Sequence, residues 1–205
     1  MSKKLFTLYL EGIADIVFFK QYIQHCFGVV VPDEQIVNLE GWTNLKGISA
    51  LRRMRSTMDN GGINIVILDA DTDFDARRND VLAWKQANGV DFELFPLPNN
   101  HDAGTLEDLL EHIINPNNRP IFDCWEHYEQ ELVQLDIPGR TPPPLTTPAK
   151  KTKIYGYLEA LLGESQKKLI KEANRNYEDT LHWNLNAEYL RYLKTFLGHH
   201  LVYVE

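Results

Sequence analysis

Residues 63–75, INIVILDADTDFD, decide the fold of this chain. The first six positions form an apolar run in which only Asn64 is polar, and most of the other residues are β-branched. Such a run is typical of a strand buried on both faces, as the strands of a parallel sheet are. It ends in acids at every second position: Asp69, Asp71, Asp73 and Asp75. We therefore expect a central parallel strand at 63–68 whose end carries several negative charges.

Apolar stretches of alternating period lie on both sides of this strand. They predict strands at residues 5–10, 35–39, 63–68 and 92–97, and helices at 14–27, 45–58, 76–88 and 105–114. Strands that alternate with helices favour a parallel sheet flanked by helices. The predicted fold class is therefore α/β: three α/β/α layers around a mostly parallel, Rossmann-like sheet of about four strands.

The second part of the chain is expected to be mainly helical. We place the α/β domain at residues 1–116 and a helical extension, packed on that domain, at residues 117–205. Its predicted elements are helices at 122–135, 154–162 and 187–197 and a short last strand at 201–204. Five prolines between Pro138 and Pro148 predict a stiff, extended connector at 138–148.

Acidic residues follow two of the predicted strands. The carboxyl ends of parallel strands meet at one edge of the sheet, so Glu11 should lie near Asp69 and Asp71, with the loop 98–104 beside them. Carboxylates held so close repel one another unless a cation lies among them. Oxygen ligands select a hard ion, Mg²⁺ or Mn²⁺. The alternative is that one of these acids, Asp73 or Asp75, caps the next helix.

Three stretches of the chain resemble the TOPRIM domain, which primases, topoisomerases and OLD-type nucleases share. They are LYLEGIADIVFFKQYI at 8–23, IVILDADTDFD at 65–75 and LPNNHDAGTLEDLL at 97–110. The TOPRIM pattern is an apolar strand that ends in Glu-Gly and a later apolar strand that ends in Asp-x-Asp. Glu-Gly-x-x-Asp followed by a later Leu-Glu is most similar to the OLD-nuclease branch and to uncharacterised bacterial stand-alone relatives. The resemblance covers roughly residues 5–114.

The resemblance implies a divalent-metal-dependent phosphoryl-transfer enzyme that acts on nucleic acid, above all a nuclease. Glu11 would ligate the metal or move a proton as a catalytic residue. The implied metal ligands, with Asp73 kept as a further candidate, are Glu11, Asp15, Asp69, Asp71, Asp73 and Glu107. The ions would neutralise the phosphate and lower the pKa of the attacking water.

The chain departs from the TOPRIM pattern in several places. Topoisomerases and primases carry a glycine shortly after Asp-x-Asp, where this chain has Thr72, Asp73 and Phe74. The chain is too short for the DNA-gate domains of a topoisomerase, and it has no zinc-binding primase module. It also has no GxxxxGK[ST] motif, so an ATPase of the kind that OLD nucleases contain would have to be a separate partner.

Residues 150–153, KKTK, precede an aromatic and apolar helix and resemble a Lys-x-Lys of the stand-alone TOPRIM relatives. Lys151 and Lys153 are candidate catalytic residues, because a lysine near the metals would stabilise the charge that develops on phosphorus oxygens. The alternative is an ordinary solvated helix start. The nearby aromatic residues Tyr155, Tyr157 and Trp183 could stack on bases, or they belong to the core.

The composition limits the partners that the chain can take. A net charge of −8 argues against a general nucleic-acid coat, although residues 140–175 hold eight basic and three acidic residues. Two distant cysteines and a short apolar start predict a cytoplasmic protein without a membrane span. The expected partner is nucleic acid, with DNA favoured over RNA; a homodimer is left open.

Two other functions fit the same residues. The first is a non-catalytic TOPRIM-like module that binds nucleic acid or a partner ATPase. The second is a phosphatase similar to the HAD family, whose nucleophile loop is also a strand followed by Asp-x-Asp. That loop usually begins the chain, whereas here it follows two strand–helix units.

Overall fold

The computed structural model describes residues 5–140 and 145–201. Its four strands form one sheet in the order β2-β1-β3-β4, and every neighbouring pair is parallel. The strands are β1 (Phe6–Leu10), β2 (Ile36–Asn38), β3 (Ile63–Asp69) and β4 (Glu93–Leu97). The predicted fold class, with its parallel sheet of four strands, is confirmed. The strand that the apolar run predicts is β3, which lies beside β1 at the centre of the sheet.

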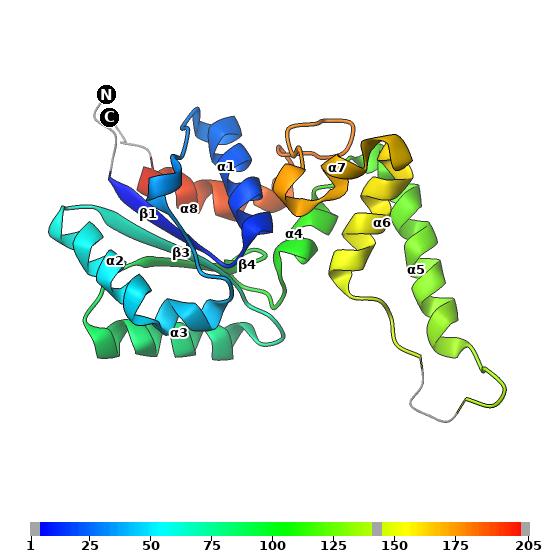
Figure 1. The fold of residues 1–205 in the computed structure, drawn as a ribbon, viewed down its shortest axis with the longest axis horizontal. Helices are drawn as coiled ribbons and strands as arrows, with labels where there is room; N and C mark the ends of the chain where they lie inside the picture. The colour runs from blue at the N-terminus through cyan, green and yellow to red at the C-terminus, as the bar shows by residue number, and fades with distance from the viewer. Residues whose placement is uncertain (1–4, 141–144, 202–205) are drawn as a thin grey trace.

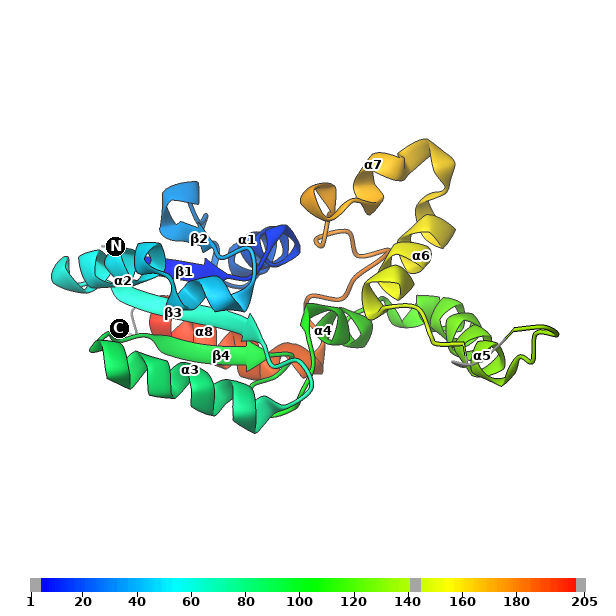
Figure 2. The same ribbon diagram turned by 60° about the horizontal axis from the view of Figure 1, so that its bottom comes forward.

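Helices cover both faces of the sheet (Figure 2). The connecting helices are α1 (Ile13–Phe27), α2 (Ile48–Asp59), α3 (Phe74–Asn88) and α4 (Leu106–His112). Successive residues of a strand point to opposite faces. On β3, Ile65 and Ile67 belong to the core on the α1 side, whereas Val66 and Leu68 pack with residues of α2 and α3.

The second part of the chain is helical, as predicted. It contains α5 (Arg119–Gln134), α6 (Lys150–Leu162), α7 (Lys167–Ile170) and α8 (Arg191–Leu201). Helices α5 and α6 form an arm that projects from the sheet, while α8 returns to the face that α1 covers (Figure 1). There the ring centroids of Phe196 and Phe95 are 5.1 Å apart. The last helix of the extension therefore completes one of the layers of the α/β fold.

Several predicted bounds shift. The helix expected at 45–58 is divided at Gly47 into a 3₁₀ turn (Trp42–Lys46) and α2. Helix α6 begins at Lys150 rather than at 154, which places the lysine-rich segment inside its first turns. The short helix α7 was not predicted. Leu201 ends α8, and the rest of the strand expected at 201–204 lies outside the described residues.

The proline-rich connector has no regular helix or strand at residues 138–140 and 145–148, which are its described parts. Within the described ranges, no helix has the length and apolar character that crossing a membrane requires.

Candidate functional site

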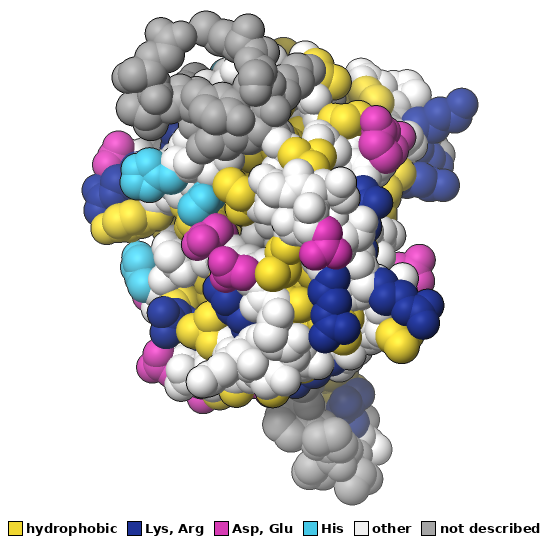
Figure 3. Space-filling model, turned by 90° about the vertical axis from the view of Figure 1, so that its left-hand side faces the viewer, with side chains coloured by type: hydrophobic (Ala, Val, Ile, Leu, Met, Phe, Trp, Pro, Cys, Tyr) yellow, Lys and Arg dark blue, Asp and Glu magenta, His cyan; other side chains and the backbone are white. Residues whose placement is uncertain are grey.

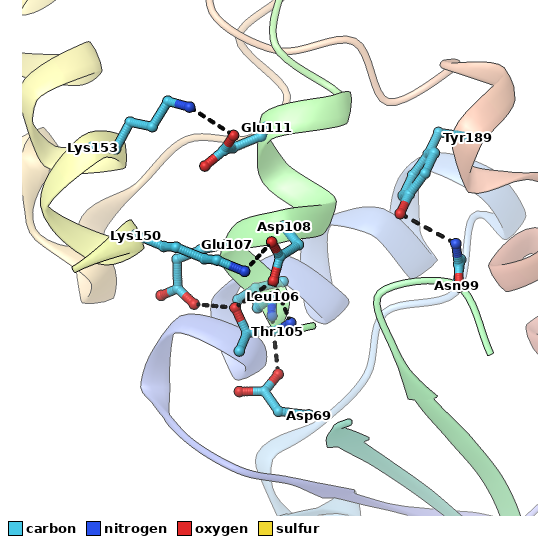
Figure 4. Close-up of polar contacts among 10 residues, drawn as sticks. All are labelled: Asp69, Asn99, Thr105, Leu106, Glu107, Asp108, Glu111, Lys150, Lys153 and Tyr189. Atoms are coloured by element: carbon cyan, nitrogen blue, oxygen red, sulfur yellow. Dashed lines mark hydrogen bonds and ion pairs between the residues drawn. The ribbon is translucent and has the colours of Figure 1, made fainter. Parts of the chain in front are cut away.

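The carboxyl edge of the sheet brings Glu11 and Asp69 together. Glu11 follows β1 directly, and Asp69 is the last residue of the neighbouring strand β3. The backbone N–H of Asp69 donates a hydrogen bond of 3.0 Å to Glu11 Oε1. The carboxylate of Asp69 in turn accepts a bond of 2.9 Å from the backbone N–H of Leu106, at the start of α4 (Figure 4). Two strands and a helix start therefore meet around these acids.

Asp15 adds a buried carboxylate from α1. It stands in the first turn, where its Oδ2 accepts a hydrogen bond of 3.1 Å from the Gly12 backbone N–H. Only 7% of the residue is exposed, and its other oxygen, Oδ1, has no hydrogen-bond partner. A buried polar atom without a partner costs free energy, so Asp15 Oδ1 is a candidate ligand atom for a group that the chain itself does not supply.

Glu107 approaches the same acids from the first turn of α4. Its Oε2 accepts a hydrogen bond of 2.9 Å from Thr105 Oγ1 (Figure 4). Asp108, the next residue, accepts a bond of 2.7 Å from the Thr105 backbone N–H and so caps the helix. Of the two neighbouring acids, Asp108 serves the helix start, whereas Glu107 remains partly exposed beside the cluster.

The pKa values of Asp69, Asp15 and Glu11 are all raised. Burial, followed by the charges of Asp15, Glu11 and Glu107, raises the pKa of Asp69 to about 9. Burial and the charges of Glu11 and Glu107 raise the pKa of Asp15 to about 7. Burial also raises the pKa of Glu11, against the hydrogen bond from the Asp69 amide. We call these four residues, Glu11, Asp15, Asp69 and Glu107, the carboxylate cluster.

This clustering distinguishes the carboxyl edge from other surfaces of the molecule. At the opposite end, where the strands begin, acidic and basic side chains are interspersed (Figure 3). At the carboxyl edge, by contrast, burial and neighbouring carboxylates raise the pKa values of Glu11, Asp15 and Asp69. Repulsion of this kind favours a cation as the missing partner.

The residues of the carboxylate cluster fit a hard divalent ion. All donor atoms are carboxylate oxygens, the ligands that Mg²⁺ and Mn²⁺ prefer, and Asp15 Oδ1 is free to coordinate. In the ranges 5–140 and 145–201, however, no three Asp, Glu, His or Cys side chains already stand in an arrangement that could hold a metal. Coordination therefore requires a rotation, for example of Asp69 away from the Leu106 amide.

Asp71 is held by other contacts. Its backbone has a left-handed φ of 55°, and its N–H donates a bond of 2.9 Å to the Gly104 carbonyl. Its carboxylate forms an ion pair with Arg77, whose guanidinium lies 3.9 Å from the centroid of the Trp42 ring. Asp71 still contributes to the raised pKa of Glu11, so it lies beside the cluster while its carboxylate is bound to Arg77.

Asp73 caps a helix. Its Oδ1 accepts a hydrogen bond of 2.9 Å from the Ala76 backbone N–H at the start of α3, and the residue is exposed. This geometry is the capping alternative considered for the acidic run, and it accounts for Asp73 without a metal ion.

We expect Asp73→Ala to lower the free energy of unfolding by about 1 kcal/mol, because the first turn of α3 loses its cap. Asp73→Ser keeps a capping oxygen and removes the charge, so it should retain most of the stability. Urea unfolding of the two variants measures the difference. Equal losses in both would show that the charge, rather than the cap, stabilises this turn.

The two predicted catalytic lysines have separate partners. Lys151 Nζ lies 2.6 Å from Glu172 Oε1, and the charge of Glu107 contributes to its raised pKa after the larger effect of Glu172. Lys153 is buried and lies 2.9 Å from Glu111 Oε2 (Figure 4). Lys151 is thus within electrostatic reach of the carboxylate cluster, whereas Lys153 is bound further along α4.

Lys150 was not among the predicted residues, although it contacts the start of α4. It forms an ion pair with Asp108, next to Glu107 (Figure 4). The sequence does not distinguish the three lysines at 150, 151 and 153. The direction in which each side chain points depends on the residue at which α6 begins. Of the aromatic candidates, Tyr157 and Trp183 are buried in the core, with ring centroids 5.5 Å apart, which excludes them from base stacking in this arrangement.

The fold and the site define the chain as an α/β protein with a buried group of carboxylates at the carboxyl edge of a parallel sheet. A family model described as "Protein of unknown function (DUF3226)" matches residues 6–200. The chain belongs to this family. No curated protein and no solved structure matches it.

Proposed function

We propose that this protein is a Mg²⁺- or Mn²⁺-dependent phosphoryl-transfer enzyme that acts on nucleic acid, and that it is a TOPRIM-type nuclease. The observation that carries the proposal is the carboxylate cluster. Acids that follow β1 or stand in α1, β3 and α4, spread over almost a hundred positions, lie close enough that Glu11 and Glu107 raise the pKa values of Asp15 and Asp69. A fold that needed these acids only for stability would gain by spacing them apart.

Each residue of the site has a defined part in this proposal. Asp15, Asp69 and Glu107 would hold the cation, which would supply charge neutralisation to the phosphate oxygens and a lower pKa to bound water. Glu11 uses one oxygen to accept the Asp69 amide, and its raised pKa suits it to take a proton from the attacking water. Lys151, about half exposed and near Glu107, offers a cation to the phosphate.

The alternative function is a non-catalytic module of the same fold that binds nucleic acid or a partner ATPase. It is favoured by the finding that no metal-binding group stands ready among the described side chains. In that case Asp15 and Asp69 would be held in their neutral forms, as their raised pKa values permit near neutral pH and below.

Cleavage assays with a matched control distinguish the two functions. Supercoiled plasmid and single-stranded DNA are incubated with the wild type and Glu11→Gln, in Mg²⁺, in Mn²⁺ and in EDTA. Glutamine can still accept the Asp69 amide, so Glu11→Gln should fold normally and lose about 10²- to 10⁴-fold in rate. Glu131→Gln, an exposed acid of α5 with the same charge change, should cleave like the wild type. Cleavage that survives EDTA or Glu11→Gln would contradict the proposal.

A further inference from the structure

Two buried polar groups of the C-terminal part lack hydrogen-bond partners. They are Arg175 Nη2 and the Tyr177 hydroxyl, in residues that are 3% and 0% exposed. An isolated guanidinium inside a protein is costly unless its donors are paired. Arg175 is only partly paired: its Nε donates a hydrogen bond of 3.1 Å to the Ile170 carbonyl, whereas its Nη2 has no partner.

Helix α1, the helix that carries Asp15, contacts the segment that holds these two groups. Gln21 contacts the segment at both residues. Its Nε2 donates a hydrogen bond of 2.8 Å to the Arg175 carbonyl, and its Oε1 accepts a hydrogen bond of 2.6 Å from the Tyr177 N–H. The Tyr177 ring meets Phe18 edge to face, at 5.2 Å between centroids. Phe18 follows Asp15 by three positions and so lies on the same side of the helix, one turn away.

Helix α6 also contacts this segment. The Arg175 guanidinium lies over the Tyr155 ring, 4.9 Å from its centroid. Lys151, one turn earlier on α6, pairs with Glu172 of the same segment. The two unpartnered groups therefore lie between the helix of Asp15 and the lysine-rich start of α6.

The electrostatic effects on Tyr177 come in part from residues of the carboxylate cluster. Burial raises the pKa of Tyr177 to about 12; Arg175 lowers that pKa, and the charges of Asp15 and Glu107 raise it. Arg175 lowers the pKa of Tyr177 through its charge and a hydrogen-bonding interaction, although Arg175 Nη2 and the Tyr177 hydroxyl form no hydrogen bond of ordinary geometry. Three unpartnered atoms, Asp15 Oδ1, Arg175 Nη2 and Tyr177 OH, thus occur on neighbouring parts of one buried region.

We propose that Arg175 and Tyr177 bind a phosphate group of the substrate next to the carboxylate cluster. The guanidinium fork and the phenol hydroxyl are donors that match phosphate oxygens, and a bound phosphate would pair the buried charge of Arg175. The carboxylate cluster would hold the divalent cation, and Arg175 and Tyr177 of the C-terminal extension would hold the phosphate. That the phosphate belongs to nucleic acid rests on the proposed function. Because both side chains are buried, the segment that carries them has to open before a phosphate can enter.

Titration with inorganic phosphate tests this proposal without cleavage. Affinity is measured by calorimetry, in EDTA and in Mg²⁺, for the wild type, Arg175→Met and Tyr177→Phe. Tyr177→Phe keeps the ring and removes a hydroxyl that has no partner, so it should fold as the wild type does. The expected result is that each variant weakens phosphate binding about 10- to 100-fold. Arg119→Met, an exposed arginine of α5, should bind phosphate like the wild type.

The outcomes separate this proposal from the proposed function. Equal phosphate affinity in the wild type and in both variants, or no binding by the wild type in either buffer, would overturn the phosphate site. If the wild type binds phosphate through these residues but cleaves no nucleic acid, the phosphate site stands and the nuclease proposal fails. Should Arg175→Met not fold, Tyr177→Phe alone decides.

Discussion

Asp69→Asn is expected to abolish metal-dependent cleavage and, at the same time, to make the folded protein more stable. Asparagine has the shape of aspartate and its oxygen can still accept the Leu106 N–H, so the start of α4 keeps its contact. What disappears is a buried carboxyl group that the folded protein keeps protonated up to a pKa of about 9, whereas the unfolded chain ionises it near pH 4. Because only the unfolded state gains from this ionisation below pH 9, removing the carboxyl group should stabilise the folded state by about 1 kcal/mol for each pH unit above 4. The same change removes a metal ligand.

Two measurements on one variant test this prediction. Urea unfolding at pH 8 should show a higher midpoint for Asp69→Asn than for the wild type in EDTA, and Mg²⁺ should raise the midpoint of the wild type alone. Asp59→Asn is the matched control, because it makes the same charge change at an exposed position at the end of α2. A variant that is less stable than the wild type and still cleaves would show that Asp69 serves the fold rather than a metal.

The second large effect is a loss of stability with rising pH, which a divalent cation should reverse. In the unfolded chain, Asp15 and Asp69 ionise near pH 4. In the folded protein their pKa values are about 7 and about 9, so the folded state retains their protons longer. The free energy of unfolding therefore falls as the pH rises from about 4, until both groups are ionised in the folded protein above pH 9. Each group contributes about 1 kcal/mol per pH unit within its window.

The cation changes this profile because it binds the ionised carboxylates. Mg²⁺ should stabilise the wild type little at pH 6 and most at pH 8–9, where the repulsion is largest. Unfolding midpoints at pH 5, 6, 7 and 8, with and without Mg²⁺, provide the test. Subtracting the profile of Asp69→Asn removes the contributions of other titrating groups. Parallel profiles for the two proteins would mean that Asp69 has an ordinary pKa.

The sequence predicts those features of the fold that depend on the local spacing of apolar residues. The apolar run that forms β3, and the alternation around it, are sufficient for the parallel sheet because each element shows its own pattern over several residues. The meeting of Glu11 and Asp69 follows from that order, since parallel strands end at one edge. Asp73 shows the limit of this reasoning: the same alternation of acids fits a metal ligand and a helix cap, and only the Ala76 hydrogen bond separates them.

Features that depend on long-range packing could not be predicted. The directions of Lys150, Lys151 and Lys153 follow from the first residue of α6, and helix starts are the least certain part of a period-based prediction. Arg175 and Tyr177 lie in an irregular segment that has no period at all. Their position is fixed by contacts with Gln21, more than 150 positions away.

The return of α8 to the sheet has a consequence for how the chain folds during synthesis. Phe95 of β4 and the neighbouring core residues of α1 remain uncovered until the helix at Arg191–Leu201 has left the ribosome. The segment with Arg175, by contrast, is held by Gln21 of α1 and by Lys151 of α6, both of which are synthesised before it. A nascent chain that stopped before Arg191 would therefore have an open sheet face, so it should be a substrate for chaperones and proteases.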